Sequence, residues 1–291
     1  MRKLSEEFNA LLKHRSVEEF VDLYLFRPIA FIIVKLIGRT PITPNQISLL
    51  SITTGIISGF FLAQGTPIGF FYGGLFYGVS HVLDCCDGMI ARLKGNGSLI
   101  GRIIDGFADY TSATAMFIGL ITGLLKADLH FIAHPWVLVI ASSISTIIHA
   151  MVVDYYKSEF LAHGLGQVNS TLDDRERFSA ELNKLREARG NYIFRFMIWV
   201  YLGYSHLQLF SNRVRIDYDQ ATYYRKNKLL LRLWTWIGIA THIFVLVLAA
   251  FLYKLEIFFY YTLVGANIWM VVLLIIQTRV NKKIARVNKG G

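Results

Sequence analysis

The sequence predicts an all-α fold, a polytopic membrane helix bundle with six transmembrane helices. Of the 291 residues, 54% are hydrophobic and only 17% are charged, fewer charges than a typical soluble domain carries. Several apolar stretches reach the length of about 20 residues that a helix needs to cross a bilayer. The formal net charge of +10 falls mainly in the stretches between them, as expected for segments on the cytosolic side of a membrane.

The first 45 residues are predicted to stay outside the bilayer. Residues 1–18 are charged and we expect a loose cytosolic arm. Residues 19–39 combine charged side chains with an apolar stretch too short to span, which predicts an amphipathic helix lying in the membrane interface. Pro41 and Pro44 end this helix. Residues 1–45 are therefore treated as one region.

The spans follow in two groups. We predict them at about residues 46–63, 68–92, 99–125 and 132–156, then at about 231–253 and 257–278. The resulting regions are a catalytic transmembrane core at 46–160, a cytosolic helical insert at 161–230, and the last two spans with a basic tail at 231–291.

The insert between spans four and five breaks the apolar pattern. Its charged run from Asp173 to Arg189 is typical of a soluble helical hairpin. The segment Tyr192–Phe210 is apolar enough to resemble a span, but a seventh span would place the basic tail outside the cell. We therefore predict an amphipathic segment there.

Four aspartates lie between spans two and three. Asp84 and Asp87 are three residues apart and Asp105 and Asp109 are four apart, so on helices each pair shares a face. Carboxylates gathered at membrane depth repel one another and take up protons unless cations hold them. Hard divalent cations prefer oxygen ligands, and two such ions can clamp a phosphoryl group from both sides. The aspartates therefore predict a metal site.

These residues carry a resemblance. The pattern Asp84-x-x-Asp87-Gly88-x-x-Ala91-Arg92, then eight residues, then Gly101-x-x-x-Asp105-x-x-x-Asp109, resembles the signature of the CDP-alcohol phosphotransferase family at all eight signature positions. A looser similarity covers residues 20–160. Arg92 ends the first half of the pattern, where a guanidinium can neutralise phosphate oxygens.

The resemblance implies an integral membrane enzyme that passes a phosphoalcohol group from a CDP-linked donor to an acceptor hydroxyl and releases CMP. It implies Mg²⁺ or Mn²⁺, with two ions, and a homodimer. The implied metal ligands are Asp84, Asp87, Asp105 and Asp109, and Asp109 is also the implied catalytic base. The implied contacts to the nucleotide and diphosphate are Asn45, Ser48, Gly88, Ala91, Arg92, Ser98 and Gly101. Two of these have a plainer alternative: Asn45 as a helix cap and Ser98 as a turn residue.

Donor and acceptor stay open. CDP-diacylglycerol is favoured, which implies phosphatidyl transfer in phospholipid biosynthesis; the alternative is a soluble CDP-alcohol, of the choline, ethanolamine or inositol type, with a lipid acceptor. The resemblance implies that Lys157 contacts the acceptor. Glu159 stands where members with phosphorylated acceptors often carry a second base, and a carboxylate there disfavours a phosphate.

Other classes of function fit less well. A transporter with an acidic ion pathway needs neither Arg92 nor a fixed spacing across a loop, and a silent scaffold does not need the complete set of aspartates. No stretch interleaves basic and aromatic residues as nucleic-acid surfaces do, so the expected partner is membrane lipid. The basic segments place the motif at the cytosolic face of the membrane. A bacterial inner membrane is favoured over an internal eukaryotic one.

The remaining reactive side chains are predicted to be structural. Cys85 and Cys86 are adjacent and lack the spacing of a zinc site, so we expect small buried helix residues. His81 precedes Asp84 by about one turn, and a structural role is favoured over contact with the acceptor.

Overall fold

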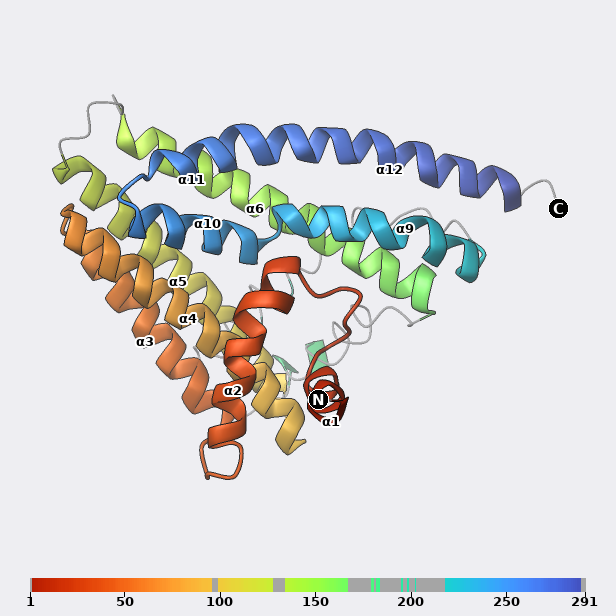
Figure 1. Ribbon diagram of the computed structural model, residues 1–291, viewed down its shortest axis with the longest axis horizontal. Helices are drawn as coiled ribbons and strands as arrows, with labels where there is room; N and C mark the ends of the chain where they lie inside the picture. Colours follow the sequence, from red (N-terminus) through yellow and green to blue (C-terminus); the bar gives the residue numbers. More distant parts are fainter. Residues whose placement is uncertain are drawn as a thin grey trace.

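The computed structural model of the chain describes residues 2–95, 99–127, 134–166 and 218–288, together with a few residues between 179 and 202. The described chain is helical, which confirms the all-α prediction (Figure 1). The regular helices are α1 (Arg2–Ala10), α2 (Arg27–Ile37), α3 (Pro44–Leu62), α4 (Pro67–Lys94), α5 (Leu99–Lys126), α6 (Pro135–Glu159), α9 (Gln220–Trp234), α10 (Ile239–Phe251), α11 (Glu256–Tyr260) and α12 (Ala266–Asn288). The short turns of π or 3-10 helix are η1 (Asp22–Phe26), η2 (Phe160–Gly164), η3 (Thr235–Ile237) and η4 (Tyr261–Gly265).

Several helices meet the criteria for crossing a bilayer. Five stretches of the described chain are long and apolar enough to do so: 44–62, 106–126, 135–164, 220–251 and 256–285. The protein is therefore an integral membrane protein. The predicted second span corresponds to α4, which has 28 residues but is not among the five, since its glycines and the charged motif lower its hydropathy. The count of six spans stays a prediction.

The insert lies largely outside the described residues. This holds for the predicted hairpin at Asp173–Arg189 and for most of the predicted amphipathic segment at Tyr192–Phe210. The last residues of the insert, from 218 on, are described, and they do not form a unit separate from the membrane helices. Helix α9 begins at Gln220 and continues through η3 into α10, so the last residues of the predicted insert extend the fifth span.

Helices α3, α4 and α5 form one group, seen in orange and yellow in Figure 1. Helix α3 lies against both others through small residues. A side chain at Gly59 would meet the backbone of Ala115, and one at Gly123 would meet the backbone of Leu62. Polar contacts add to this packing, because Ser51 Oγ donates to the Ser80 carbonyl at 2.9 Å. Helices α4 and α5, which carry the aspartate motif, are therefore each packed closely against α3.

The start of α3 corrects one prediction. Thr43, not Asn45, is the N-cap: its hydroxyl accepts from the Gln46 backbone N–H, and the Gln46 side chain accepts from the Thr43 N–H at 2.9 Å. This reciprocal pair is a capping box, and Pro44 occupies the first helical position. Asn45 is exposed in the first turn, where its side chain is left available for another role.

The second group consists of α6, α9 with α10, and α12, which runs beside α6 in Figure 1. Helix α10 packs on α4 and joins the two groups, with Gly74 of α4 close to Ala250. A polar network links α9 and α12 inside the group. Gln277 donates to Asn227 at 2.5 Å and accepts from the Trp234 ring N–H at 3.2 Å.

The N-terminal arm is not loose, which overturns that prediction. Within residues 1–18, Leu11, Leu12, Val17 and the acidic Glu18 are buried, and Glu19, which follows the arm, is buried as well. Apolar side chains of the arm reach the main core, where Phe8 meets the Phe31 ring edge-on. We refer to residues 11–27 as the N-terminal segment; it leads into α2, which packs against α4.

Candidate active site

The first aspartate pair lies in the C-terminal half of α4. Asp87 is buried and Asp84 is partly buried. Ser48 of α3 donates from its hydroxyl to Asp87 Oδ2 at 2.5 Å. Ser48 was predicted to face the nucleotide; in the structure it holds a motif carboxylate. A short hydrogen bond from a neighbouring helix fixes the orientation of that carboxylate.

Arg92 closes the same helix. Its Nε donates to the carbonyl oxygen of Leu11 in the N-terminal segment at 2.6 Å. The guanidinium lies over Gly88, where an added Cβ would sit 3.3 Å from one of its terminal nitrogens. Gly88 therefore leaves space for the Arg92 guanidinium, and the neighbouring residue in the chain, Ala91, has only a methyl side chain. The helix ends one turn on, at Gly95, whose φ of +61° suits glycine.

The second aspartate pair belongs to α5. Asp109 is exposed on this helix, and it interacts electrostatically with Tyr77 and His81 of α4. Asp105 lies in the same helix, but its side chain is outside the described residues, as is Ser98. Gly101 occupies the first turn of α5 and is partly buried. The described half of the pair therefore faces the helix that carries the first pair.

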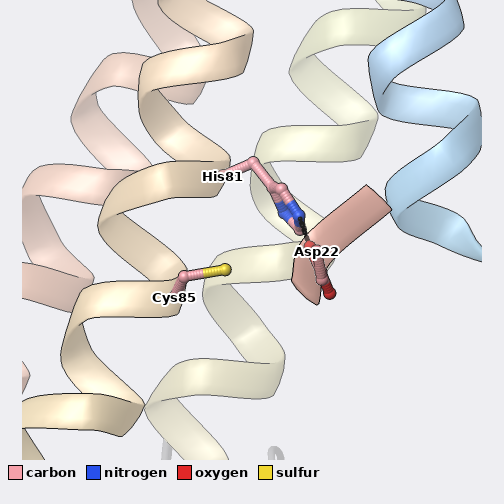
Figure 2. Close-up of side chains that lie close together, drawn as sticks. All are labelled: Asp22, His81 and Cys85. Atoms are coloured by element: carbon pink, nitrogen blue, oxygen red, sulfur yellow. Dashed lines mark hydrogen bonds and ion pairs between the residues drawn. The ribbon is translucent and has the colours of Figure 1, made fainter. Parts of the chain in front are cut away.

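The N-terminal segment contributes three acidic side chains that the motif does not predict. Glu18 pairs with Arg27 at 2.8 Å, and Asp22 Oδ1 pairs with His81 Nε2 of α4 at 2.8 Å. Burial raises the pKa of Asp22, but His81 and Arg27 outweigh burial and hold that pKa below its usual value. Figure 2 shows His81 and Cys85 directed from α4 toward Asp22. The predicted structural role of His81 fits this pairing.

Glu19 holds the third of these contacts, on Lys157 of α6. Lys157 Nζ lies 2.9 Å from Glu19 Oε1 and 3.5 Å from Asp154 Oδ1. The other oxygen of Glu19 accepts from the backbone N–H of Ala240 at 2.9 Å, which caps the start of α10. Gly238 lies against the same carboxylate. The predicted acceptor residue Lys157 is therefore ion-paired by an acid that is fixed from two sides.

Glu159, two residues further on, is turned to a different partner. Its carboxylate lies 3.6 Å from His163 Nε2, one turn along the same helical stretch. Two further bases that follow in the chain, Arg213 and Arg215, lie outside the described residues. Arg232 of α9 donates to the carbonyl oxygen of Arg15 at 3.3 Å.

Sequence reasoning missed Glu19 and Asp22 as parts of this site. The only local signal is that they are three residues apart, so that on a helix they share a face. Their partners lie 138 and 59 residues away in the chain, and spacing along the sequence cannot identify such pairs.

Comparison with known proteins agrees with the motif. Residues 41–173 match the family model described as CDP-alcohol phosphatidyltransferase. Three curated relatives are named phosphatidylinositol phosphate synthase. The Corynebacterium glutamicum protein is 27% identical over 150 residues, covering 52% of this chain and 65% of the relative. The Mycobacteroides abscessus protein is 24% identical over 142 residues, covering 48% and 60%. The Mycobacterium bovis protein is 28% identical over 159 residues, covering 54% and 69%.

The matches do not extend over whole proteins. The first two relatives are each covered over less than two thirds of their own length. The matched range contains α3 to α6 with the motif, Ser48 and Lys157. The N-terminal segment precedes this range, and α9 to α12 follow it. The contacts of Glu19 and Asp22 therefore join residues outside the matched range to helices inside it.

Proposed function

We propose that this chain, whose residues 41–173 carry a CDP-alcohol phosphatidyltransferase domain, transfers a phosphatidyl group from CDP-diacylglycerol to an acceptor hydroxyl and releases CMP. The observation that carries the proposal is the complete acidic motif on α4 and α5, with Asp87 held by Ser48 and Asp109 directed toward α4. The names of the three relatives support a lipid donor and a polar acceptor.

The motif suits a hard divalent cation. Its side-chain donors are carboxylate oxygens, the ligand type that Mg²⁺ and Mn²⁺ prefer, and a neighbouring serine orients one of them. Asp84, Asp87, Asp105 and Asp109 would hold two such ions. When bound, the metal supplies electrostatic stabilisation of the charge that develops on the diphosphate.

The protein groups have separate tasks in this reaction. Arg92 binds phosphate oxygens beside Gly88. Asp109 accepts the proton of the acceptor hydroxyl, whose oxygen attacks the phosphorus that bears the diacylglycerol. The new oxygen–phosphorus bond forms as the bond to the CMP oxygen breaks. Because Asp109 is exposed while Asp87 is buried, the base can meet a diffusing acceptor while the buried carboxylate stays fixed.

The acceptor is proposed to be an alcohol without a phosphate group. Lys157 is already paired with Glu19 and lies near Asp154, so a phosphate placed there would meet two carboxylates. The relatives' names describe a phosphorylated product, and an acceptor assay distinguishes the two possibilities. The proposal places the motif at the cytosolic face of the membrane, in agreement with the basic N-terminal arm and tail.

The test is CMP release by the purified full-length protein in detergent or lipid. With labelled CDP-diacylglycerol and Mg²⁺, we expect CMP and a new phospholipid when a suitable alcohol is supplied, and neither in the presence of a chelator. The acceptor panel contains inositol, inositol phosphate, glycerol phosphate, serine and ethanolamine. CDP-choline and CDP-ethanolamine with diacylglycerol test the reverse arrangement. Full turnover in chelator, or turnover with the soluble donors alone, contradicts the proposal.

A further inference from the structure

A second cluster of metal-ligating atoms lies beside the motif. Asp22, His81 and Cys85 each offer one ligand atom, and these atoms all lie within 4.8 Å of one another (Figure 2). His81 and Cys85 are four residues apart on α4, the spacing that places two side chains on one helix face. Asp22 approaches from the N-terminal segment. A carboxylate, an imidazole and a thiol from two elements thus converge on one point.

This cluster is distinct from the aspartates of α4. At 100° per residue, the midpoint between His81 and Cys85 lies about a third of a turn around the helix from the midpoint between Asp84 and Asp87. The two sets of ligands also differ in chemistry. Oxygen ligands suit Mg²⁺ and Mn²⁺, whereas a set of sulfur, nitrogen and oxygen suits Zn²⁺.

We propose that Asp22, His81 and Cys85 bind a Zn²⁺ ion that fastens the N-terminal segment to α4. Tetrahedral zinc with ligand distances of about 2.0–2.3 Å places its ligand atoms about 3.5 Å apart. The 2.8 Å hydrogen bond between Asp22 and His81 has to open slightly and the Cys85 sulfur has to move closer, both changes on the scale of side-chain rotation. Three protein ligands leave the fourth position to water or another small ligand.

The surroundings of the cluster favour a bound metal. A Zn²⁺ ion with one thiolate and one carboxylate is electrically neutral, which lowers the cost of placing it among buried groups. The nearby Arg27 is already paired with Glu18 at 2.8 Å. The edge-on ring of Phe26, 4.7 Å from the His81 ring centre, restricts the orientation of the imidazole.

Zn²⁺ binding displaces protons from the protein ligands. The Cys85 thiol gives its proton to solvent when the sulfur becomes a metal ligand, and a proton on His81 Nε2 has to leave that nitrogen, for Nδ1 of the same ring or for solvent. Zinc affinity should therefore rise with pH. Cys86 takes no part in this cluster, because its Sγ lies 3.7 Å from the Ala30 carbonyl oxygen. The site therefore uses only one of the two adjacent cysteines.

Cobalt replaces zinc in the experiment because a cobalt–thiolate bond gives a near-ultraviolet charge-transfer band and cobalt on carboxylates does not. The full-length protein, purified without metal, is titrated with Co²⁺ and then with Zn²⁺. We expect a thiolate band that saturates at one ion per chain and disappears as Zn²⁺ displaces Co²⁺. The band should be absent in Cys85→Ser and unchanged in Cys86→Ser, the matched neighbour.

A measurement on the unaltered protein guards against a misfolded variant. Maleimide labelling followed by peptide mass spectrometry should show Cys85 protected by Zn²⁺ but not by Mg²⁺, with no change at Cys86. Asp22→Asn should weaken Zn²⁺ binding at least tenfold. A titration without a thiolate band, a band that survives in Cys85→Ser, or a Cys85 labelling rate that Zn²⁺ does not alter would overturn the proposal. None of these readouts depends on transferase activity, so the proposed function is tested separately.

Discussion

The two sides of the candidate active site are held together in different ways. On the side of α3, α4 and α5, small residues bring the helices into close contact, and Ser48 reaches the buried Asp87. On the side of α6 and α10, one carboxylate, Glu19, pairs with Lys157 and caps α10. The first side relies on the shape of neighbouring helices, and the second on charge supplied from the distant N-terminal segment.

Under the proposed function, this difference separates the residues that carry the chemistry from those that select the acceptor. The aspartates lie on helices that pack closely against α3 through small residues. Such rigid packing holds ligand side chains in place, which a metal site requires. The proposed acceptor side depends on an ion pair between Lys157, inside the range that matches the family model, and Glu19, which precedes that range. Substitutions on the two sides should therefore affect different measurements: rate and metal affinity on the first, and acceptor preference on the second.

The largest effect is expected at Asp109. Asp109→Asn should lower the rate of CMP release by about 10²–10⁴-fold, the usual consequence of losing a general base. Because the side chain is exposed, folding and donor binding should be retained. Asp87→Asn should instead weaken metal and donor binding together, since Asp87 is buried. Rates are measured at saturating Mg²⁺ with CDP-diacylglycerol; a near-normal rate for Asp109→Asn removes it from the role of base.

A smaller effect on the same side is expected at Ser48. Ser48→Ala removes the hydrogen bond to Asp87, and losing such a partner of a metal ligand typically costs about 10–100-fold in metal affinity. The measurement is the Mn²⁺ concentration that gives half-maximal CMP release. Ser58→Ala is the control, because Ser58 lies in the same helix and donates to the Gly73 carbonyl at 2.7 Å, away from the motif. Equal metal requirements in both variants would contradict the assigned role of Ser48.

Close packing on this side is tested at Gly119. A Cβ there would collide with the backbone of Gly59, so Gly119→Ala should force α3 and α5 apart and lower the free energy of unfolding by about 1–3 kcal/mol. Gly78→Ala is the control, since its Cβ would meet Val247 at an ordinary 3.7 Å. Both are followed by thermal unfolding in detergent. A Gly119→Ala protein as stable as the control would show that the helix contact tolerates expansion.

The sequence located the helices of the first side but not the ion pair of the second, and the reason is physical. Helical periodicity places Asp84 with Asp87 and Asp105 with Asp109, because residues three or four apart share a face. Prolines and capping residues likewise located the start of α3 to within a few residues, although the cap is Thr43. No periodicity connects Glu19 with Lys157.

The charged arm shows the same limit. Its acids and bases are typical of a solvated segment, and we predicted that it would be loose. The structure buries Leu11, Leu12 and Val17 and pairs the buried acid of the arm, Glu18, with Arg27 at the start of α2. The next acids along the chain, Glu19 and Asp22, pair with core helices. A buried acid is indistinguishable from a surface acid in sequence when its partner lies more than a hundred residues away, as Lys157 does from Glu19.

The last prediction concerns that partner and tests the acceptor side directly. Glu19→Gln removes the negative charge beside Lys157 but keeps an oxygen that can accept from Ala240, so the start of α10 stays capped. Lys157 then becomes more available to a phosphate. We expect the ratio of rates with inositol phosphate and inositol to rise on the order of tenfold, which corresponds to about 1.4 kcal/mol. The change should fall mainly on KM, because the substitution alters binding and leaves Asp109 in place.

Glu18→Gln is the matched control for this experiment. It removes the same charge one residue earlier, but Glu18 pairs with Arg27 and not with Lys157. A rise in the ratio confined to Glu19→Gln would show that the ion pair sets acceptor preference, whereas an equal rise in both variants would indicate a general effect of charge near the membrane. A wild-type protein that already prefers inositol phosphate would contradict the proposed acceptor, and bases other than Lys157, which is paired with Glu19, would then have to hold the phosphate.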